Sequence, residues 1–468
     1  MSGSANIGVI GLGVMGRNLA LNFADRGMGV AGMDRNPGAV QDFASGDDRL
    51  VAATSAKELA ASLVRPRTAL LMVPSGAPVD AVVDDLVEHF ETGDIIIDGG
   101  NSRWTDTAAR IERCAAAGVR FVGMGISGGA RGAREGPSMM PGGDRDAWAH
   151  IEGPLRGAAA QAHGEPCCDW IGPGGSGHFV KMVHNGIEYG LMQLICEVYQ
   201  LLRMAAGVDA RGAADTFERW NSGDLDSFLV EITGRVLGID DEDGTPRVER
   251  IVDHGEQKGT GRWTAQDALE LGVAAPTITA AVEARNLSGA RDLRERITET
   301  VGAGPGASER IEPDTLERAL GAAFRLCYAQ GMEILRAASD AHAWALDLHS
   351  ILGLWRGGCI IRARMLDELR GAVADGPRHA LLHGPIADRM KNDRAALTET
   401  LHVAHAHRIP TPGLSASLGY LDQLAAVALP HNLLQAQRDA FGSHGYRRTD
   451  RGGVFTADWL GDGAERSK

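Results

Sequence analysis

Short apolar runs alternate with amphipathic segments in the N-terminal part of the chain. The apolar runs have the length of buried strands and lie at residues 7–10, 30–34, 69–73, 94–98 and 120–124. The segments between them have helical periodicity, as at 17–26, 78–90 and 105–117. Because apolar strands that alternate with helices are typical of a parallel sheet covered on both faces, this pattern predicts an α/β domain.

The strand pattern ends at the glycine-rich segment 172–177, and long amphipathic stretches follow to near residue 440. Such a segment is a natural domain boundary. From residue 437 the chain is rich in Gly and Arg and has no helical period, and its aromatic side chains favour docking on a neighbouring surface over a disordered terminus. The sequence therefore predicts an α/β domain at 1–177, an all-helical domain at 178–436 and a tail at 437–468.

Polar side chains interrupt an otherwise apolar helical pattern just after this boundary. Lys181, Asn185 and Glu188 follow one another at intervals of four and three residues, which places them on one helix face. His184 lies at the edge of this stripe. Buried charge is costly unless it is paired or used. A structural Lys–Glu pair is the simpler interpretation of the stripe alone, whereas its place at a domain boundary, where substrate clefts are common, favours an active site.

The first apolar run leads into a GxGxxG turn with glycines at 11, 13 and 16 and then into a helical stretch. Backbone amides and the helix N-terminus bind a pyrophosphate in this arrangement. The motif alone is weak, but the second run ends in Asp34, near the position at which a ribose is usually recognised. Two further glycine-rich segments, 99–102 and 125–129, follow later strands and are expected at the same ligand-binding edge of the sheet.

Composition excludes several classes of protein. The net charge of −14 argues against a nucleic-acid partner. No apolar run is long enough to span a bilayer and the N-terminus lacks the features of a secretion signal, so we expect a cytoplasmic protein without a membrane partner. Six cysteines without a CxxC pair favour reduced thiols. His402, His405 and His407 lack further ligands nearby, so we expect a solvated helix end and no metal.

Together these segments resemble the 6-phosphogluconate dehydrogenase family, the decarboxylating enzymes of the pentose phosphate pathway, over nearly the whole chain. Matching stretches occur in the family's order, among them GLGVMGRNLALN, IIIDGGNS, GSGHFVKMVHNGIEYG, QKGTGRWT, WRGGCIIRA and QAQRDAFGSHGY. The resemblance implies a Rossmann-like N-terminal domain, a large all-α domain for substrate binding and dimerisation, and a tail that reaches the partner subunit of a homodimer. It also implies NADP or NAD as cofactor.

The resemblance further assigns roles to the residues that match. Lys181 would be the general base and Glu188 the general acid, with Asn185 beside them. Substrate contacts within one subunit would be Asn101, Ser127, Gly128, Gly129, His184, Tyr189, Lys258, Thr260 and Arg285. Arg438 and His444 of the partner subunit would complete the site. Cofactor contacts would be Gly11, Gly13, Met15, Gly16, Asp34, Arg35, Asn36, Val73 and Asn101.

The reaction that the resemblance implies is the oxidative decarboxylation of 6-phosphogluconate to ribulose 5-phosphate and CO2. A lysine kept neutral by burial would take the proton of the 3-hydroxyl as hydride leaves carbon 3. The β-keto acid formed in this way loses CO2 when the protonated lysine polarises its keto oxygen. A protonated Glu188 would then supply a proton to carbon 1.

The sequence departs from the family where the cofactor is recognised. The family commonly has Asn-Arg-Thr after the second strand to hold the 2′-phosphate of NADP, and here the triplet is Asp34-Arg35-Asn36. A carboxylate prefers a free ribose 2′-hydroxyl, although Arg35 can still pair with a phosphate. Pro74 also stands where many relatives have a lysine. We expect relaxed or NAD-leaning cofactor choice, with NADP still usable; the departures at Ala130-Arg131 and Ala440 remove no group that the mechanism needs.

Two other functions are compatible with parts of the pattern. A 3-hydroxyisobutyrate-type β-hydroxyacid dehydrogenase shares the first domain and the helix lysine, but it is shorter and lacks the QKGTGRWT and RDAFGSH segments. A non-catalytic nucleotide-binding dimer is the alternative from another class, since a fold does not prove activity. Retention of Lys181 and Glu188 argues against it.

Overall fold

The computed structural model describes residues 5–45, 47–302, 308–374 and 379–468. The chain divides into two compact units, Met1–Leu418 and Gly419–Lys468. The first unit contains the predicted α/β domain and residues 178–418 of the predicted helical domain. The boundaries expected at residues 177 and 436 stay predictions.

A seven-stranded sheet forms the centre of the α/β domain, in the order β3-β2-β1-β4-β5-β6-β7. Its strands are β1 Ile7–Ile10, β2 Val30–Met33, β3 Leu50–Ala52, β4 Thr68–Leu71, β5 Ile95–Asp98, β6 Arg120–Ser127 and β7 Ser138–Gly143. All neighbours pair in parallel except β7, which runs antiparallel to β6. The predicted parallel sheet is confirmed. The short strand β3 and the antiparallel β7 were not predicted.

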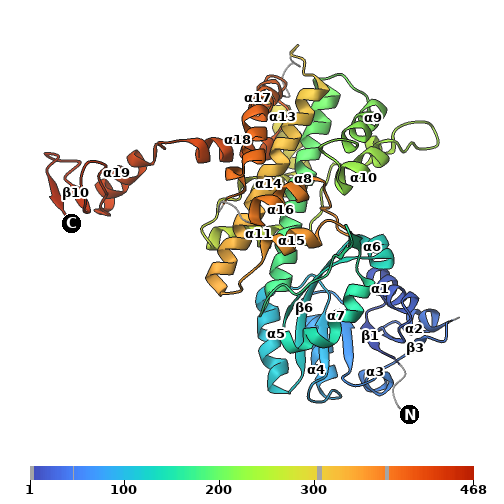
Figure 1. Ribbon diagram of the computed structural model, residues 1–468. Coiled ribbons are helices and arrows are strands. Elements are labelled where there is room, and N and C mark those ends of the chain that lie inside the picture. The colour runs from blue at the N-terminus through green and yellow to red at the C-terminus, as the bar shows by residue number, and fades with distance from the viewer. Residues whose placement is uncertain (1–4, 46, 303–307, 375–378) are drawn as a thin grey trace. The chain divides into compact units, whose positions relative to one another are not determined.

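Helices cover both faces of this sheet (Figure 1). They are α1 Val14–Asp25, α2 Pro37–Ala44, α3 Ala56–Ser62, α4 Ala77–Val87, α5 Trp104–Ala116, α6 Gly129–Glu135 and α7 Arg145–Ala158. Alternate residues of β1 enter different cores: Ile7 and Val9 pack with α1 and α7, and Ile10 packs with α3 and α4. A small hairpin of β8 Gln161–Ala162 and β9 Glu165–Pro166 follows.

The rest of the first unit is helical, built around two long helices that pack on each other, α8 Ser176–Met204 and α14 Pro313–His342. The other α-helices are α9 Ala210–Asn221, α10 Phe228–Leu237, α11 Thr260–Glu270, α12 Pro276–Ser288, α13 Arg291–Val301, α15 Leu348–Leu354, α16 Met365–Ala374 and α17 Gly384–Ala406, and α18 Pro412–Ala425 begins in this unit and continues past Leu418. Two short 3-10 helices lie at Arg247–Arg250 and Ala380–Leu382. In the parts of the chain that the structure describes, no helix combines the length and the apolar character that crossing a bilayer requires.

The second unit contains α19 His431–Gly442 and an antiparallel pair, β10 Phe455–Ala457 with β11 Glu465–Ser467. The expectation that no helix continues past residue 437 was wrong, because α19 extends to Gly442 although several of its apolar side chains are exposed. The unit is organised around the buried carboxylate of Asp439. That group accepts hydrogen bonds from Gly445 N, Thr456 Oγ1, Ala457 N and Trp459 Nε1 at 2.7 to 3.1 Å.

Candidate active site

The polar stripe lies on α8 where this helix meets β6. The predicted burial of the helix is confirmed: Lys181 is 5%, His184 0% and Asn185 8% exposed. Glycines allow the close approach, because a Cβ on Gly125 of β6 would lie only 2.2 Å from Lys181 Cβ. A Cβ on Gly177 would lie 2.3 Å from the carbonyl oxygen of Gly123. The glycine-rich sequence on both elements therefore brings the lysine to the carboxyl edge of the sheet.

Hydrogen bonds connect the polar groups of the stripe. Lys181 Nζ donates to Asn185 Oδ1 at 2.6 Å and lies 3.1 Å from His184 Nδ1. His184 Nε2 lies 3.0 Å from Ser127 Oγ, at the end of β6. Glu188 is close on the same face, with Oε2 at 3.9 Å from His184 Nδ1. The structure thus brings together the predicted base, acid and neighbouring substrate contacts.

Burial shifts the pKa values of Lys181, His184 and Glu188 so that each neutral form is favoured. It lowers the pKa of Lys181, an effect that the nearby Glu188 partly opposes. It raises the pKa of Glu188, against the attraction of Lys181 and Arg285. It also lowers the pKa of His184 well below its usual value. A buried site that favours a neutral amine beside a protonated carboxyl can both remove and deliver a proton.

Cys359 is a member of this network that the sequence reasoning missed. Its Sγ lies 2.9 Å from His184 Nε2, and the neighbouring Ile360 N donates to Ser127 Oγ at 3.2 Å. Burial raises the pKa of the Cys359 thiol to about 12, so it stays protonated. The sequence feature that could have drawn attention to Cys359 is the glycine pair before it, which is typical of a tight turn. Gly358 indeed adopts a φ of +57°.

The predicted phosphate and sugar contacts lie near the same face of α8. Thr260 begins α11, and its Oγ1 accepts from Asn185 Nδ2 at 3.1 Å. The guanidinium of Arg285 stacks on Tyr189, with Cζ 3.4 Å from the ring centroid. Lys258 lies in the loop before α11. Cationic side chains such as Arg285 suit an anionic sugar, even in a chain with an acidic balance.

The glycine turn after β1 has the shape that a pyrophosphate needs. Gly11 has a φ of +95°, and a Cβ there would lie 2.7 Å from the carbonyl oxygen of Met72. Gly13 faces open space, and α1 begins at the next residue. Backbone can therefore approach a ligand closely at a helix N-terminus. The residues present fit a dinucleotide.

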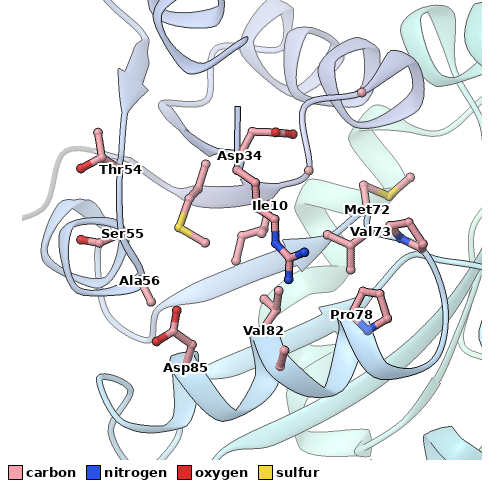
Figure 2. Close-up of a pocket in the computed structure, with 16 residues that line it drawn as sticks. Ile10, Asp34, Thr54, Ser55, Ala56, Met72, Val73, Pro78, Val82 and Asp85 are labelled. Carbon is pink, nitrogen blue, oxygen red and sulfur yellow. The ribbon is translucent and has the colours of Figure 1, made fainter. Parts of the chain in front are cut away.

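A cavity of about 570 Å³ opens beside this turn (Figure 2). Of the predicted cofactor contacts, those that line it are Gly11, Gly13, Asp34, Arg35 and Val73. The remaining four do not: Met15, Gly16, Asn36 and Asn101. The Asn36 side chain instead caps α2 by accepting from Gly38 N at 3.0 Å, and Asn101 is exposed in the loop after β5. Pro74 also lies in the cavity wall.

The remaining predicted residues lie at the start of α6, on α17 and in the second unit. Arg438 and His444 belong to the second unit and are exposed there. Ser127 precedes the predicted contacts Gly128 and Gly129, which form the turn into α6. His402 and His405 are exposed on α17, while His407 Nε2 donates to the carbonyl oxygen of Glu309 at 2.7 Å. No cluster of three His, Cys, Asp or Glu side chains suited to a metal occurs within the described ranges.

Comparison with known proteins assigns the whole architecture to one family. A model described as the NAD binding domain of 6-phosphogluconate dehydrogenase matches residues 6–172, and the C-terminal domain of the same enzyme matches 177–459. A decarboxylating 6-phosphogluconate dehydrogenase of Saccharomyces cerevisiae is 45% identical over 94% of this chain and 92% of its own. That of Synechococcus elongatus is 46% identical over 97% of this chain and 99% of its own.

A solved structure agrees with the sequence matches. The 6-phosphogluconate dehydrogenase of Plasmodium falciparum superposes with a TM-score of 0.93 at 38% identity, covering 97% of this chain and 100% of that one. Two models of a single family therefore cover residues 6–172 and 177–459. The chain belongs to the family of 6-phosphogluconate dehydrogenases.

Proposed function

We propose that this protein converts 6-phosphogluconate to ribulose 5-phosphate and CO2 while reducing a nicotinamide dinucleotide. The observation that carries the proposal is the buried pair on α8, Lys181 and Glu188, whose pKa values are shifted in opposite directions. The relatives named above are decarboxylating 6-phosphogluconate dehydrogenases, and the Plasmodium falciparum enzyme is described in complex with NADP+ and with 6-phosphogluconate. These names support the same substrate.

Lys181 takes the proton of the substrate's 3-hydroxyl, because burial favours its neutral amine. When bound, the nicotinamide cofactor accepts the hydride from carbon 3. The β-keto acid then loses CO2 as the protonated Lys181 polarises its keto oxygen. Glu188, whose protonated form burial favours, delivers a proton to carbon 1 of the enediol. Because base and acid lie on one helix, their separation is fixed before the substrate binds.

The other matched side chains hold the substrate and orient this pair. Asn185 links Lys181 to Thr260 through its two amide atoms. His184 is kept neutral by burial and lies between Lys181 and Ser127. Asn101 and the Ser127-Gly128-Gly129 turn follow adjacent strands at the carboxyl edge, where both ligands would meet.

Cofactor choice is proposed to lean toward NAD, with NADP still usable. Asp34 accepts hydrogen bonds from Leu12 N at 2.7 Å and from Asn36 N at 2.8 Å, so its carboxylate is fixed at the rim of the cavity. A fixed negative charge there suits a ribose hydroxyl and opposes a 2′-phosphate. Pro74 supplies no compensating cation. Arg35 remains as a partner for NADP.

The protein is further proposed to act as a homodimer. Two phosphate-binding side chains, Arg438 and His444 of the partner subunit, would complete each site. Both are exposed on the second unit, and their chemistry matches that of Arg285 and Lys258. Exposed apolar residues on α13, Leu293, Ile297 and Val301, share one helix face and are available to an interface.

One experiment tests reaction and cofactor together. Purified protein is mixed with 6-phosphogluconate and either NAD or NADP, and the reduced cofactor and released CO2 are quantified in the same sample. Equal yields of the two products support the proposal. Reduced cofactor without CO2 would indicate a simple β-hydroxyacid dehydrogenase. Absence of both products, with cofactor binding intact, would favour a non-catalytic nucleotide-binding protein.

A further inference from the structure

The cavity beside the glycine turn is lined by a second carboxylate, which comes from another element than Asp34. Asp85 lines this cavity from α4, whereas Asp34 lines it from the end of β2 (Figure 2). Its volume of about 570 Å³ lies within the ordinary range of small-molecule sites. Arg35 is the one cationic side chain in the wall formed by the described residues.

The α4 side of this wall is otherwise apolar. Pro78, Ala81, Val82 and Asp85 line the cavity, and their spacing of three, one and three residues places them on one helix face. The neighbouring Asp84 does not line the cavity and instead pairs with Arg113 at 3.4 Å. The helix therefore presents one carboxylate to the cavity, and its neighbour forms a separate ion pair.

The charges of the cavity wall are not neutralised elsewhere. Within the described chain, neither Asp34 nor Asp85 forms an ion pair within 4.0 Å, and Arg35 has no acidic partner at that distance. Two carboxylates against one guanidinium leave the wall negative. The 2′-phosphate of NADP would add about −1.5 to −2 charges to this space, which a free hydroxyl does not. Repulsion of this kind extends over about 8 Å at physiological salt and needs no direct contact.

We propose that Asp85 is a second specificity-determining residue, which disfavours the 2′-phosphate of NADP and so selects a dinucleotide with a free ribose hydroxyl. This inference rests on the proposed function, because it concerns the cofactor of that reaction. It gives α4 a part in cofactor selection, in addition to the triplet Asp34-Arg35-Asn36 that follows β2. Asp34 and Asp85 oppose the phosphate from two walls of one cavity, and Arg35 can compensate for one of them.

Two adjacent substitutions separate a local effect from one of net charge. Asp85→Asn and Asp84→Asn remove the same charge from neighbouring positions of α4, but only Asp85 lines the cavity. Dissociation constants for NADH and NADPH are measured by fluorescence titration at low and physiological salt. We expect Asp85→Asn to tighten NADPH binding about three- to tenfold at low salt, a gain that shrinks as salt rises. NADH binding should change less than about twofold, and Asp84→Asn should leave both ligands near wild type.

Several outcomes would overturn the proposal. They are equal effects of the two substitutions, no change in the NADPH constant, or equal weakening of NADH and NADPH by Asp85→Asn. Asp85→Lys should lower the dissociation constant for NADPH further than Asp85→Asn does. If it does not, the proposal is also contradicted. Because binding is measured without turnover, a protein that fails to oxidise 6-phosphogluconate still gives a clear result here. Failure of the proposed function and failure of this inference are therefore distinguishable.

Discussion

Lys181 and Glu188 lie about two turns apart on one face of a buried helix, and each charge changes the pKa of the other. Burial favours the neutral lysine and the protonated glutamate, while their mutual attraction favours the ion pair. The two forms contain the same number of protons, so pH does not select between them, and the interaction between the two groups makes the pair titrate as one coupled system. A site of this kind can start and finish a proton cycle without exchanging protons with solvent.

Removing either member should give a distinct kinetic signature. Lys181→Met should abolish nearly all turnover, and Glu188→Gln should lower kcat about 10²- to 10⁴-fold, the usual contribution of general acid–base catalysis. Wild-type activity should follow a bell-shaped pH profile. In Glu188→Gln the alkaline decline should disappear, because no acid remains to be deprotonated. The acidic limb should move to lower pH, since loss of the carboxylate lowers the pKa of Lys181 further.

The measurement is kcat against pH for wild type and Glu188→Gln, with circular dichroism to establish that both are folded. An alkaline limb that persists in Glu188→Gln would show that another group is the acid. Lys181→Met with substantial turnover would contradict the assignment of the base.

At the scale of elements, sequence reasoning succeeded where burial imposes a pattern. Strands β1, β2, β4 and β5 are mostly apolar, with only Thr68 and Asp98 as polar end residues, because both faces of a parallel sheet are covered. The edge strand β3 has three residues and β7 contains Pro141 and two glycines, so neither shows that pattern. Helical spacing predicted the Lys181 face of α8. Cys359 was missed because it reaches His184 from 175 positions along the chain, which no local pattern records.

Close packing of α8 on β6 makes a prediction about Gly125. An alanine there would place its Cβ 2.2 Å from Lys181 Cβ, with backbone of both elements fixed nearby. Gly125→Ala should lower the free energy of unfolding by about 1–3 kcal/mol, as overpacking usually does, and should reduce kcat by displacing the lysine. Gly13→Ala is the control for folding, because a Cβ at that position meets open space. A stable, fully active Gly125→Ala variant would contradict this packing.

A second element-scale prediction concerns the start of α18. Buried Glu197 on α8 accepts from Gly413 N at 2.7 Å and from Leu414 N at 2.8 Å. Glutamine offers one acceptor fewer, so Glu197→Gln should cost about 1–3 kcal/mol of unfolding free energy. Burial raises the pKa of Glu197 to about 7. Its contribution to wild-type stability is thus present below the unfolded pKa and lost as pH rises through 7.

Thermal unfolding of wild type and Glu197→Gln at about pH 5.5 and about pH 8 tests this linkage. The wild-type midpoint should fall more between the two values than that of the variant. Equal pH dependence in both proteins would show that Glu197 is ionised throughout this range.

At the scale of the whole molecule, the second unit contributes to the proposed chemistry only if it folds by itself. It is small, and its order depends on one carboxylate rather than on a large apolar core: Asp439 links α19 to the turn at Gly445 and to β10. The neighbouring Arg438 and nearby His444 are presented on this framework. The sequence indicated docking of this segment from its aromatic residues, but not its internal fold, because a polar hub has no periodic signature.

Asp439→Asn should therefore loosen the second unit and, if the proposed dimer forms, weaken substrate binding at the site that this unit completes. The amide cannot accept from all four donors, and the lowered pKa of Asp439, about 2, shows that the carboxylate is the stabilised form. The contribution of Asp439 to stability is present above its unfolded pKa of 3.8 and is lost only as pH falls through 2, so the loss of stability in Asp439→Asn should be seen at neutral pH.

Asp450→Asn is the matched control, since Asp450 forms an exposed pair with Arg448, and such pairs contribute little. Limited proteolysis should cleave the Asp439→Asn tail faster than that of the control, with a raised KM for 6-phosphogluconate and an unchanged KM for the cofactor. If the Asp439→Asn tail were cleaved faster without any rise in substrate KM, Arg438 and His444 would have no part in binding.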